Sequence, residues 1–276
     1  VFDHVYQEMK TEHQCVKIID DDGNFQEKID SLKGERVVLI TTDHFQTRRG
    51  SQKYIIDEIV SILSPIKKYY SLHDLGVSHR SESNLSDWNI ILPTTDWNYF
   101  FEDLDARKIP LGYPKYFRNE VDIEYESIFF PSLIYIYKDR DFSSFYNDFR
   151  FIFDNGIPIK FPDYSGSYEL IEKLRRGGIE MNLLDTNLSS FDLLFKCNNS
   201  ITNSNSSIGV EAVIAGANSI NIGNGYQPSE FYRRFPIINT DMGQISKYIS
   251  NSRNLSPLVE YKFNKEGCIK EIIDET

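Results

Sequence analysis

The sequence is short of positive charge. Its 30 Lys and Arg residues are outnumbered by 41 Asp and Glu, which gives a formal net charge of −11. Binding along duplex DNA or RNA needs clustered Lys and Arg to neutralise phosphates, so this balance argues against a nucleic-acid partner. The pairs Arg48-Arg49 and Arg233-Arg234 remain candidates for holding one phosphorylated small molecule.

Cysteine and long apolar runs are also scarce. The three cysteines, Cys15, Cys197 and Cys268, are far apart and odd in number, which implies neither a metal site nor a disulfide framework. No stretch approaches the roughly 18 consecutive apolar residues of a membrane-spanning helix. The charged N-terminal residues do not resemble a signal peptide. We therefore expect a cytoplasmic protein.

Apolar residues, at 40%, and aromatic residues, at 14%, are plentiful enough for a sizeable core. Short β-rich runs alternate with helix-like stretches, the pattern of parallel α/β layers. Expected strands lie at residues 36–42, 66–72, 89–92, 109–115, within 127–137, and at 157–162, 179–184, 199–203 and 219–222. Expected helices lie at residues 51–63, 97–104, 142–155, 168–176, 191–196 and 206–215.

The charged segment Arg118–Glu126 is the best candidate for a boundary between two lobes. We place the lobes at residues 1–122 and 123–276, each an α/β unit. Phe145, Phe149 and Phe153 recur at helical spacing, which predicts a helix face packed on a sheet. The aromatic stretch from Trp97 is interpreted in the same way; the alternative is a platform for stacking sugar rings, formed by Trp97 and Tyr99.

The most informative stretch runs from Ile201 to Gly216 and continues into a strand that ends at Gly223. It indicates a strand, a small polar turn, a helix, a glycine and a further strand. Ser204–Ser207 would lie at the helix N-terminus, where unpaired N–H groups and a positive dipole favour anions. Gly209 would let a ligand or a neighbouring backbone approach closely. Ordinary helix caps use the same small polar residues, so the pattern alone leaves both interpretations open.

The run Asn205-Ser-Ser-Ile-Gly-Val-Glu-Ala212, with Gly216, resembles the donor-site signature of glycosyltransferases of the GT-B fold, above all the bacterial capsule-polysaccharide transferases. It is also similar to the CDP-glycerol glycerophosphotransferases of teichoic acid synthesis. Three upstream segments lie in the order of that second family: Leu72-His-Asp-Leu-Gly76, Gly112-Tyr-Pro-Lys115 and Ile159-Lys-Phe-Pro162. Phe161 replaces that family's His, and Asn203 or Asn205 replaces an Asp. Both departures favour a sugar nucleotide over CDP-glycerol.

The resemblance implies an α/β fold with two Rossmann-like lobes of parallel sheets and a cleft between them. Residues 1–122 would form the acceptor-side lobe, and residues 123–276 the nucleotide-donor lobe. GT-B enzymes generally stabilise the leaving nucleotide with helix dipoles and cations, so neither a metal nor a cofactor beyond the donor is expected. The donor-binding residues that the resemblance implies are Asn205, Ser206, Ser207 and Gly209 for the phosphates, Glu211 for the ribose, and Lys160 and Arg233 as phosphate-neutralising cations.

Lys160 and the pair Arg233-Arg234 each have a simpler interpretation as solvated surface cations. An inverting transfer also needs a general base that removes a proton from the acceptor hydroxyl. Ligands of open α/β sheets bind at the carboxyl ends of the strands, which gives three candidates. His73 with Asp74 is the first, His44 with Asp43 the second, and Asp96 the third. The alternative for His73 is a loop histidine with no catalytic part.

The leading hypothesis is a transferase that moves a sugar from a nucleotide-activated donor to a surface or capsular glycan or a glycolipid. It would work in the cytoplasm, with peripheral association at the inner face of the membrane left open. A CDP-alcohol phosphotransferase of teichoic-acid-like polymer synthesis is the first alternative. A hydrolysing nucleotide-sugar epimerase and a catalytically degenerate GT-B binding module are the others. The oligomeric state is left open.

Overall fold

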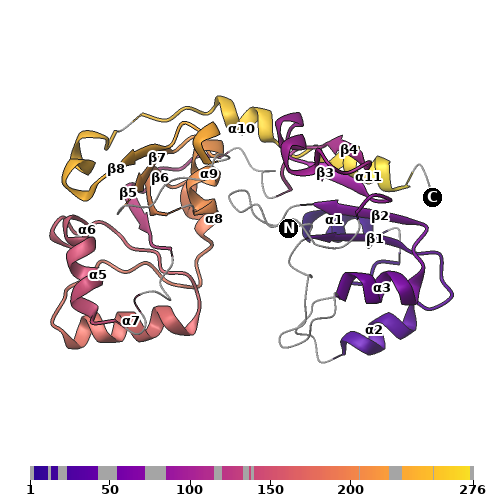
Figure 1. Cartoon of the computed structure of the whole chain (residues 1–276), viewed down its shortest axis with the longest axis horizontal. Helices are drawn as coiled ribbons and strands as arrows, with labels where there is room; N and C mark the ends of the chain where they lie inside the picture. The colour runs from indigo at the N-terminus through magenta and orange to yellow at the C-terminus, as the bar shows by residue number, and fades with distance from the viewer. Residues whose placement is uncertain are drawn as a thin grey trace. The chain divides into compact units, whose positions relative to one another are not determined.

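The computed structural model describes residues 3–11, 14–17, 24–42, 55–71, 85–114, 120–132, 137, 140–204, 206–223, 232–250 and 252–273. They form two units (Figure 1), one of residues 3–114 and 260–273, the other of residues 120–259. Each unit contains a four-stranded sheet whose strands are all parallel. Parallel strands need crossover connections, which are usually helical. The two units are thus Rossmann-like α/β lobes, as expected from the sequence.

The first sheet has the order β1-β2-β3-β4. Its strands are β1 (Val38–Thr42), β2 (Lys67–Ser71), β3 (Asn89–Leu92) and β4 (Arg107–Pro110). Its helices are α1 (Asp3–Met9), α2 (Phe25–Ser31), α3 (Ile55–Leu63), the 3-10 helix η2 (Thr95–Phe101) and α11 (Lys265–Ile273). Ile59 and Leu63 of α3 pack with Ile29 of α2, so the apolar face expected for residues 51–63 does face a core. Trp97 is only 1% exposed, which confirms its role in packing.

The C-terminal segment belongs to the first unit, whereas the sequence analysis assigned all of residues 123–276 to the second lobe. The Tyr113 N–H donates to the Tyr261 carbonyl (3.0 Å), and the Asn264 N–H donates to the Leu111 carbonyl (2.7 Å). Apolar side chains of α11, among them Ile272, join the core beneath the first sheet. Burial of these side chains is what draws the last residues back to this unit.

The second sheet contains β5 (Tyr125–Phe130), β6 (Cys197–Asn203), β7 (Asn218–Ile222) and β8 (Ile238–Thr240), in that order. Two isolated parallel bridges, Phe129↔Ile159 and Ile159↔Leu183, extend it beyond β5. Counting these segments, the spatial order is third, second, first, fourth, fifth, sixth. This is the doubly wound order of dinucleotide-binding folds, and it reverses between β5 and β6.

The segments at residues 157–162 and 179–184 were expected to be full strands. The structure pairs them only at Ile159 and Leu183. Pro158 directly precedes Ile159 and Pro162 follows three residues later; neither has an N–H to donate, which limits the pairing of this segment.

The helices of the second unit fall into two groups in Figure 1. The first group is α5 (Phe142–Asp148), α6 (Arg150–Asp154) and α7 (Ser165–Arg176). The second is α8 (Ser190–Leu194) and α9 (Ser207–Ile214), which pack on each other and on the sheet. The short helices η3 (Tyr232–Arg234), η4 (Met242–Lys247) and α10 (Ser256–Tyr261) follow.

The helix expected at residues 142–155 is interrupted at Phe149, whose φ of −121° is not helical. Phe145 and Phe149 are nonetheless fully buried, with ring centroids 4.9 Å apart, and Phe153 packs against the same core. The predicted packing role of these aromatic side chains is therefore confirmed.

No helix among the described residues combines the length and apolarity needed to cross a bilayer.

Arg253 ties the second group of helices to the sheet. Its Nη2 donates to the carbonyls of Ala215 (2.7 Å) and Leu194 (3.1 Å), and its Nη1 donates to those of Leu194 (3.1 Å) and Cys197. The carbonyls at the ends of α8 and α9 lack intrahelical partners and carry negative partial charge. One guanidinium thus satisfies two helix ends and the start of β6, and its burial lowers the pKa of Arg253.

We predict that Arg253→Met destabilises the protein by about 2–3 kcal/mol, because it leaves these carbonyls without a charged donor. Arg176→Met is the matched control, since the Arg176 Nε contacts only Glu172 (3.0 Å) on an exposed face of α7. The control should change stability by at most about 0.5 kcal/mol. Urea denaturation of both variants provides the comparison, and equal stabilities would contradict the role assigned to Arg253.

Candidate functional site

The N-terminus of α9 lies at the reversal of strand order in the second sheet. β6 ends at Asn203, Ser204 turns the chain with a φ of +57°, and Ser206 is the N-cap of α9. Residues 209–214 of α9 are buried, whereas residues 206–208 are half-exposed. The first turn is thus the part of α9 that a ligand can reach.

This first turn has the features of an anion site. The Ser206 side chain makes no capping hydrogen bond. The Gly209 N–H donates to the Ser206 carbonyl (3.0 Å), while the N–H groups before it, at Ser207 and Ile208, precede the first acceptor that helix geometry supplies. The helix dipole adds positive potential there. Ser206 and Ser207 also bring two hydroxyl groups to the same place. The arrangement can accept a phosphate or a carboxylate of a ligand.

Gly209 is required by packing inside the protein. A Cβ at this position would lie 2.0 Å from the Tyr232 hydroxyl oxygen and 3.4 Å from the Thr202 hydroxyl oxygen. Tyr232 belongs to η3 and is fully buried, so its hydroxyl fills the space beside the first turn of α9. Burial raises the pKa of Tyr232 to about 12, against a smaller lowering by the nearby Thr202 hydroxyl. The space that a side chain at residue 209 would fill is thus occupied by protein. The phosphate contact predicted for Gly209 stays a prediction.

Glu211 and Gly216 complete α9. Glu211 is 2% exposed, so its carboxylate is enclosed by the protein, and the ribose contact stays a prediction. Gly216 ends the helix as expected. Its φ is +83°, and a Cβ there would lie 2.5 Å from the Asn254 carbonyl oxygen. Both the conformation and the close approach of residue 254 require glycine at this position.

Lys160 lies next to the isolated bridge at Ile159 and is 3% exposed. Its Nζ donates to the carbonyls of Phe161 and Thr186, both at 2.8 Å. Burial lowers the pKa of Lys160, although Asp163 and Asp185 act in the opposite direction. The ammonium thus binds backbone carbonyls in this structure, and a phosphate contact remains a prediction.

Phe161 is part of the core. Its side chain is 1% exposed and its ring centroid lies 5.9 Å from that of Phe145. The side chain that replaces the histidine of the glycerophosphotransferases therefore contributes to packing.

Arg233 and Arg234 follow the buried Tyr232 in η3, and both are exposed. Tyr232, whose hydroxyl lies beside the first turn of α9, directly precedes Arg233 in the chain. The exposure fits both a surface cation and a phosphate ligand.

Several predicted site residues lie outside the described residues: Asn205, Asp43, His44, His73 and Asp74. The side chain of Tyr99 is likewise outside the described part. Asp96, the third candidate base, is described; it is exposed at the start of η2, after the carboxyl end of β3.

Sequence reasoning did not assign a role to Ser132, Thr202 or Tyr232. Ser132 follows β5 and meets Asn203 and Ser204 across the sheet, with its Oγ 3.1 Å from the Ser204 Oγ. These contacts join residues about 70 positions apart, which no local pattern reveals.

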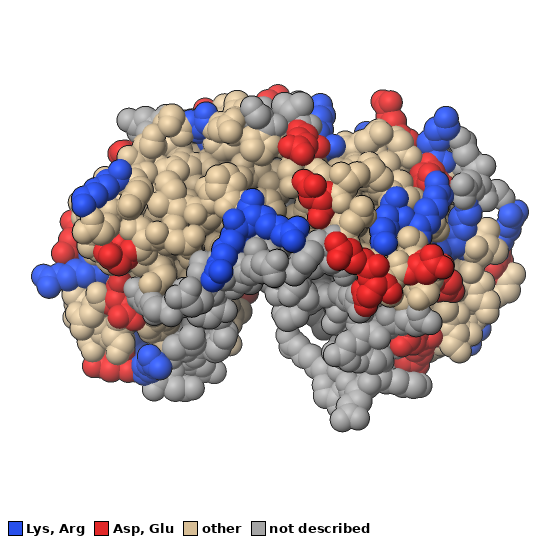
Figure 2. Space-filling view, turned by 45° about the horizontal axis from the view of Figure 1, so that its top comes forward, with Lys and Arg blue, Asp and Glu red and all other residues tan. Residues whose placement is uncertain are grey.

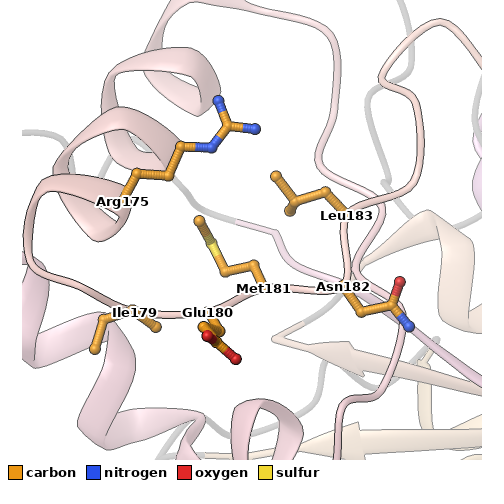
Figure 3. A pocket seen from close by; sticks show the side chains of 6 residues that line it. All are labelled: Arg175, Ile179, Glu180, Met181, Asn182 and Leu183. Carbon is orange, nitrogen blue, oxygen red and sulfur yellow. The ribbon is translucent and has the colours of Figure 1, made fainter.

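A hollow in the second unit lies elsewhere. It has a volume of about 600 Å³ and is lined by Arg175 of α7 and by residues 179–183 (Figure 3). In Figure 3, Arg175 projects from its helix towards Met181 and Leu183. Leu183 is the outermost bridged residue of the sheet, separated from β6 by the Ile159 segment and β5. The hollow is therefore not at the reversal of strand order.

Charges of both signs are mixed on the face in Figure 2, where the described Lys and Arg residues form no broad basic area. Within the described ranges, no group of three or more His, Cys, Asp and Glu residues could hold a metal ion.

No family model matches the chain, and no curated protein matches its sequence. Among solved structures, the chain resembles "Spinosyn Forosaminyltransferase SpnP", with 14% identity and a TM-score of 0.35 over 79% of this chain and 69% of that chain. It also resembles a "Glycosylation Associate Protein (Gap123) complex from Streptococcus agalactiae", with 16% identity and a TM-score of 0.36 over 90% of this chain and 55% of that chain. At these values, the likeness concerns the coarse arrangement of the chain alone.

We predict that Gly209→Ala destabilises the protein by about 2 kcal/mol, because the added methyl group overlaps the Tyr232 hydroxyl. Tyr232→Phe removes the nearest atom, so that the closest ring carbon would be 3.0 Å away. The double variant should therefore lose at least about 1 kcal/mol less than the sum of the two single variants. Urea denaturation of the four proteins measures this coupling, and additive losses would refute the contact.

Proposed function

We propose that this protein is a glycosyltransferase that takes its sugar from a nucleotide-activated donor and binds the donor diphosphate at the N-terminus of α9. One observation carries the proposal: the strand order reverses between β5 and β6, and α9 follows β6 directly. Ligands of open α/β sheets bind at such a reversal, outside the carboxyl ends of the strands. The resemblance of residues 205–212 to a donor-site signature supports the same position.

The chemistry of sugar transfer suits this end of α9. As the bond between sugar and diphosphate breaks, negative charge grows on the leaving nucleotide. The first N–H groups of α9, the hydroxyls of Ser206 and Ser207, and the guanidinium of Arg233 would stabilise that charge. Glu211 would bind the ribose, and Lys160 and Asn205 complete the proposed donor site. Neither a metal nor a further cofactor is part of this proposal.

The acceptor in this proposal is a surface or capsular glycan or a glycolipid, held by the first unit in a GT-B arrangement. His73, with Asp74 beside it in the sequence, is the proposed general base, and His44 with Asp43 is the second choice. The reaction would take place in the cytoplasm or at the inner face of the membrane.

A module that binds nucleotide or glycan without turnover is the second candidate function. The packing of Phe161 in the core favours it over a CDP-alcohol phosphotransferase, because the family's phosphate-binding imidazole has no counterpart at this position. The transferase must bind a nucleotide and turn it over. The module performs no turnover, and if it binds only glycan it need not bind a nucleotide.

The first test is stabilisation of the protein by UDP, CDP, CMP and GDP, measured by thermal shift. A nucleotide at 100 times its Kd should add about 2.7 kcal/mol to the free energy of unfolding. One nucleotide should stand out, and stabilisation by CDP alone would favour the CDP-alcohol alternative. Stabilisation by none of them would remove the transferase proposal.

Ser207→Asp tests the site within the same assay. Ser207 is the first residue of α9, so a carboxylate there should favour the helix dipole and raise stability by about 0.3–1 kcal/mol. The same carboxylate should repel a diphosphate and weaken nucleotide binding at least tenfold.

The matched control is Ser190→Asp, which makes the same change at the first residue of α8. It should raise stability in the same direction and leave nucleotide binding unchanged. If Ser207→Asp binds nucleotide as the wild type does, the diphosphate site is not at α9.

His73→Ala should lower turnover by about 10²–10⁴-fold, the usual contribution of a general base, and leave the Kd for the donor unchanged. His79→Ala is the control, because His79 lies close by in the sequence but has no predicted role. Turnover can be followed as release of the nucleoside diphosphate from a sugar nucleotide. Full activity of His73→Ala would move the base to His44 or Asp43.

A further inference from the structure

The side chain of Asn203 joins the carboxyl ends of β5 and β6. Its Oδ1 accepts a hydrogen bond from the Ser132 N–H (2.7 Å), and its Nδ2 donates to the Ser132 carbonyl (3.1 Å). The last backbone pair between these strands is Phe130↔Thr202, so the amide continues the pairing where the ladder has stopped. Asn203 is 8% exposed, and both edges of its amide are used.

Ser132 in turn holds the start of the loop that leads to α9. Its hydroxyl donates to the Asn203 carbonyl and lies 3.1 Å from the Ser204 Oγ. Ser204 has a φ of +57°, a left-handed conformation that costs a residue other than glycine about 1–2 kcal/mol. Such a conformation persists only where the surroundings impose it. The Ser204 carbonyl then accepts from the N–H of Ser206, the N-cap of α9 (2.9 Å).

These contacts form one chain from β5 to the first turn of α9. We propose that Asn203 is a positioning residue that holds Ser204 in its left-handed turn and thereby directs the first N–H groups of α9 at the donor diphosphate. The proposal rests on the proposed function. It deepens that function by assigning the orientation of the anion site to the double hydrogen bond between Asn203 and Ser132.

In Asn203→Asp, the protonation state of the new side chain decides whether one or both of the hydrogen bonds to Ser132 can form. As a carboxylate, the new side chain can accept from the Ser132 N–H but repels the Ser132 carbonyl. As a neutral carboxyl, it has nearly the shape of the amide and can both accept and donate. Burial and the facing carbonyl should raise its pKa above the ordinary value of about 3.9. The double hydrogen bond should therefore be lost at neutral pH and recovered in mild acid.

The experiment measures the Kd of wild type and Asn203→Asp for the stabilising nucleotide by calorimetry between pH 7.5 and pH 5. We expect Asn203→Asp to bind at least tenfold more weakly at pH 7.5, and the ratio of the two Kd values to approach one as the pH falls. The ratio removes the titration of the nucleotide and of groups common to both proteins, Glu211 and the histidines included. Stability should follow the same sign, because a group whose folded pKa is raised loses its contribution as the pH rises.

Asn221→Asp is the matched control. Asn221 is fully buried in the neighbouring strand β7 and donates to the Asn239 Oδ1 (2.8 Å), away from the pair formed by Asn203 and Ser132. The same substitution there should cost stability and leave the Kd ratio near one at every pH. If Asn203→Asp does not fold at pH 7.5, Asn203→Ala takes its place and should bind weakly at every pH.

Three results would overturn the proposal. Equal Kd values for wild type and Asn203→Asp across the pH range would remove the positioning role and leave the proposed function intact. If Asn203→Asp binds weakly at every pH while Asn203→Ala binds as the wild type does, the loss of binding comes from misfolding of the Asp variant and not from the lost hydrogen bond. A wild type that binds none of the four nucleotides would end both the proposed function and this inference.

Discussion

The reversal of strand order in the second sheet is the constraint from which the site follows. β5 has the Ile159 segment on one side and β6 on the other, so the connections that leave these two adjacent strands move away in opposite directions. α9 follows the carboxyl end of β6, so its first turn lies at this reversal, where ligands of open α/β sheets bind. Residues 209–214 of α9 are all buried and, apart from Glu211, are small or apolar, as in a helix enclosed on several sides. The small polar residues Ser206 and Ser207 lie at the N-terminus of α9, where the helix dipole is positive.

In the second unit, several polar side chains form hydrogen bonds with backbone groups where the pairing of strands or helices ends. Asn199, fully buried in β6, donates to the Glu126 carbonyl (2.7 Å) and accepts from Asn218 and from the Ser250 N–H, both at 2.9 Å. Lys160 and Arg253 likewise satisfy carbonyls at places where helices or short bridges end. Buried carbonyls without partners are costly, so each such side chain makes an irregular connection tolerable. Asn199 thus has a specific structural role at this position.

Local patterns were sufficient to find most of the elements. The strands at residues 38–42, 89–92 and 197–203, the helix that becomes α9, and its end at Gly216 all follow from apolar runs and caps. The two bridged segments were overestimated, because the prolines around Ile159 limit pairing more than β propensity promotes it. The return of α11 to the first unit was missed, since burial against distant residues decided it.

For the candidate site, sequence reasoning located the helix end but not what surrounds it. The position of α9 and of the serines at its N-terminus could be anticipated from one strand–turn–helix pattern, whereas Arg233 was named from the resemblance, with a surface cation as its simpler interpretation. The partners of these residues could not. Tyr232 is 23 positions from Gly209, and Ser132 is 71 positions from Asn203, so each contact depends on the folded sheet. Because a glycine near a helix N-terminus looks the same whether a ligand or a tyrosine approaches it, the pattern could not separate the two.

The tyrosine has a consequence for how a diphosphate could lie in the proposed site. Tyr232 and Thr202 occupy the space on the sheet side of Gly209, so a ligand cannot enter between the first turn of α9 and β6. The approach that remains is along the helix axis, to residues 206–208, which are half-exposed. An axial approach places the phosphates where the dipole potential is highest and where several N–H groups converge. Tyr232 thus closes one side of the proposed site and leaves the axial approach open. The next residue, Arg233, is exposed.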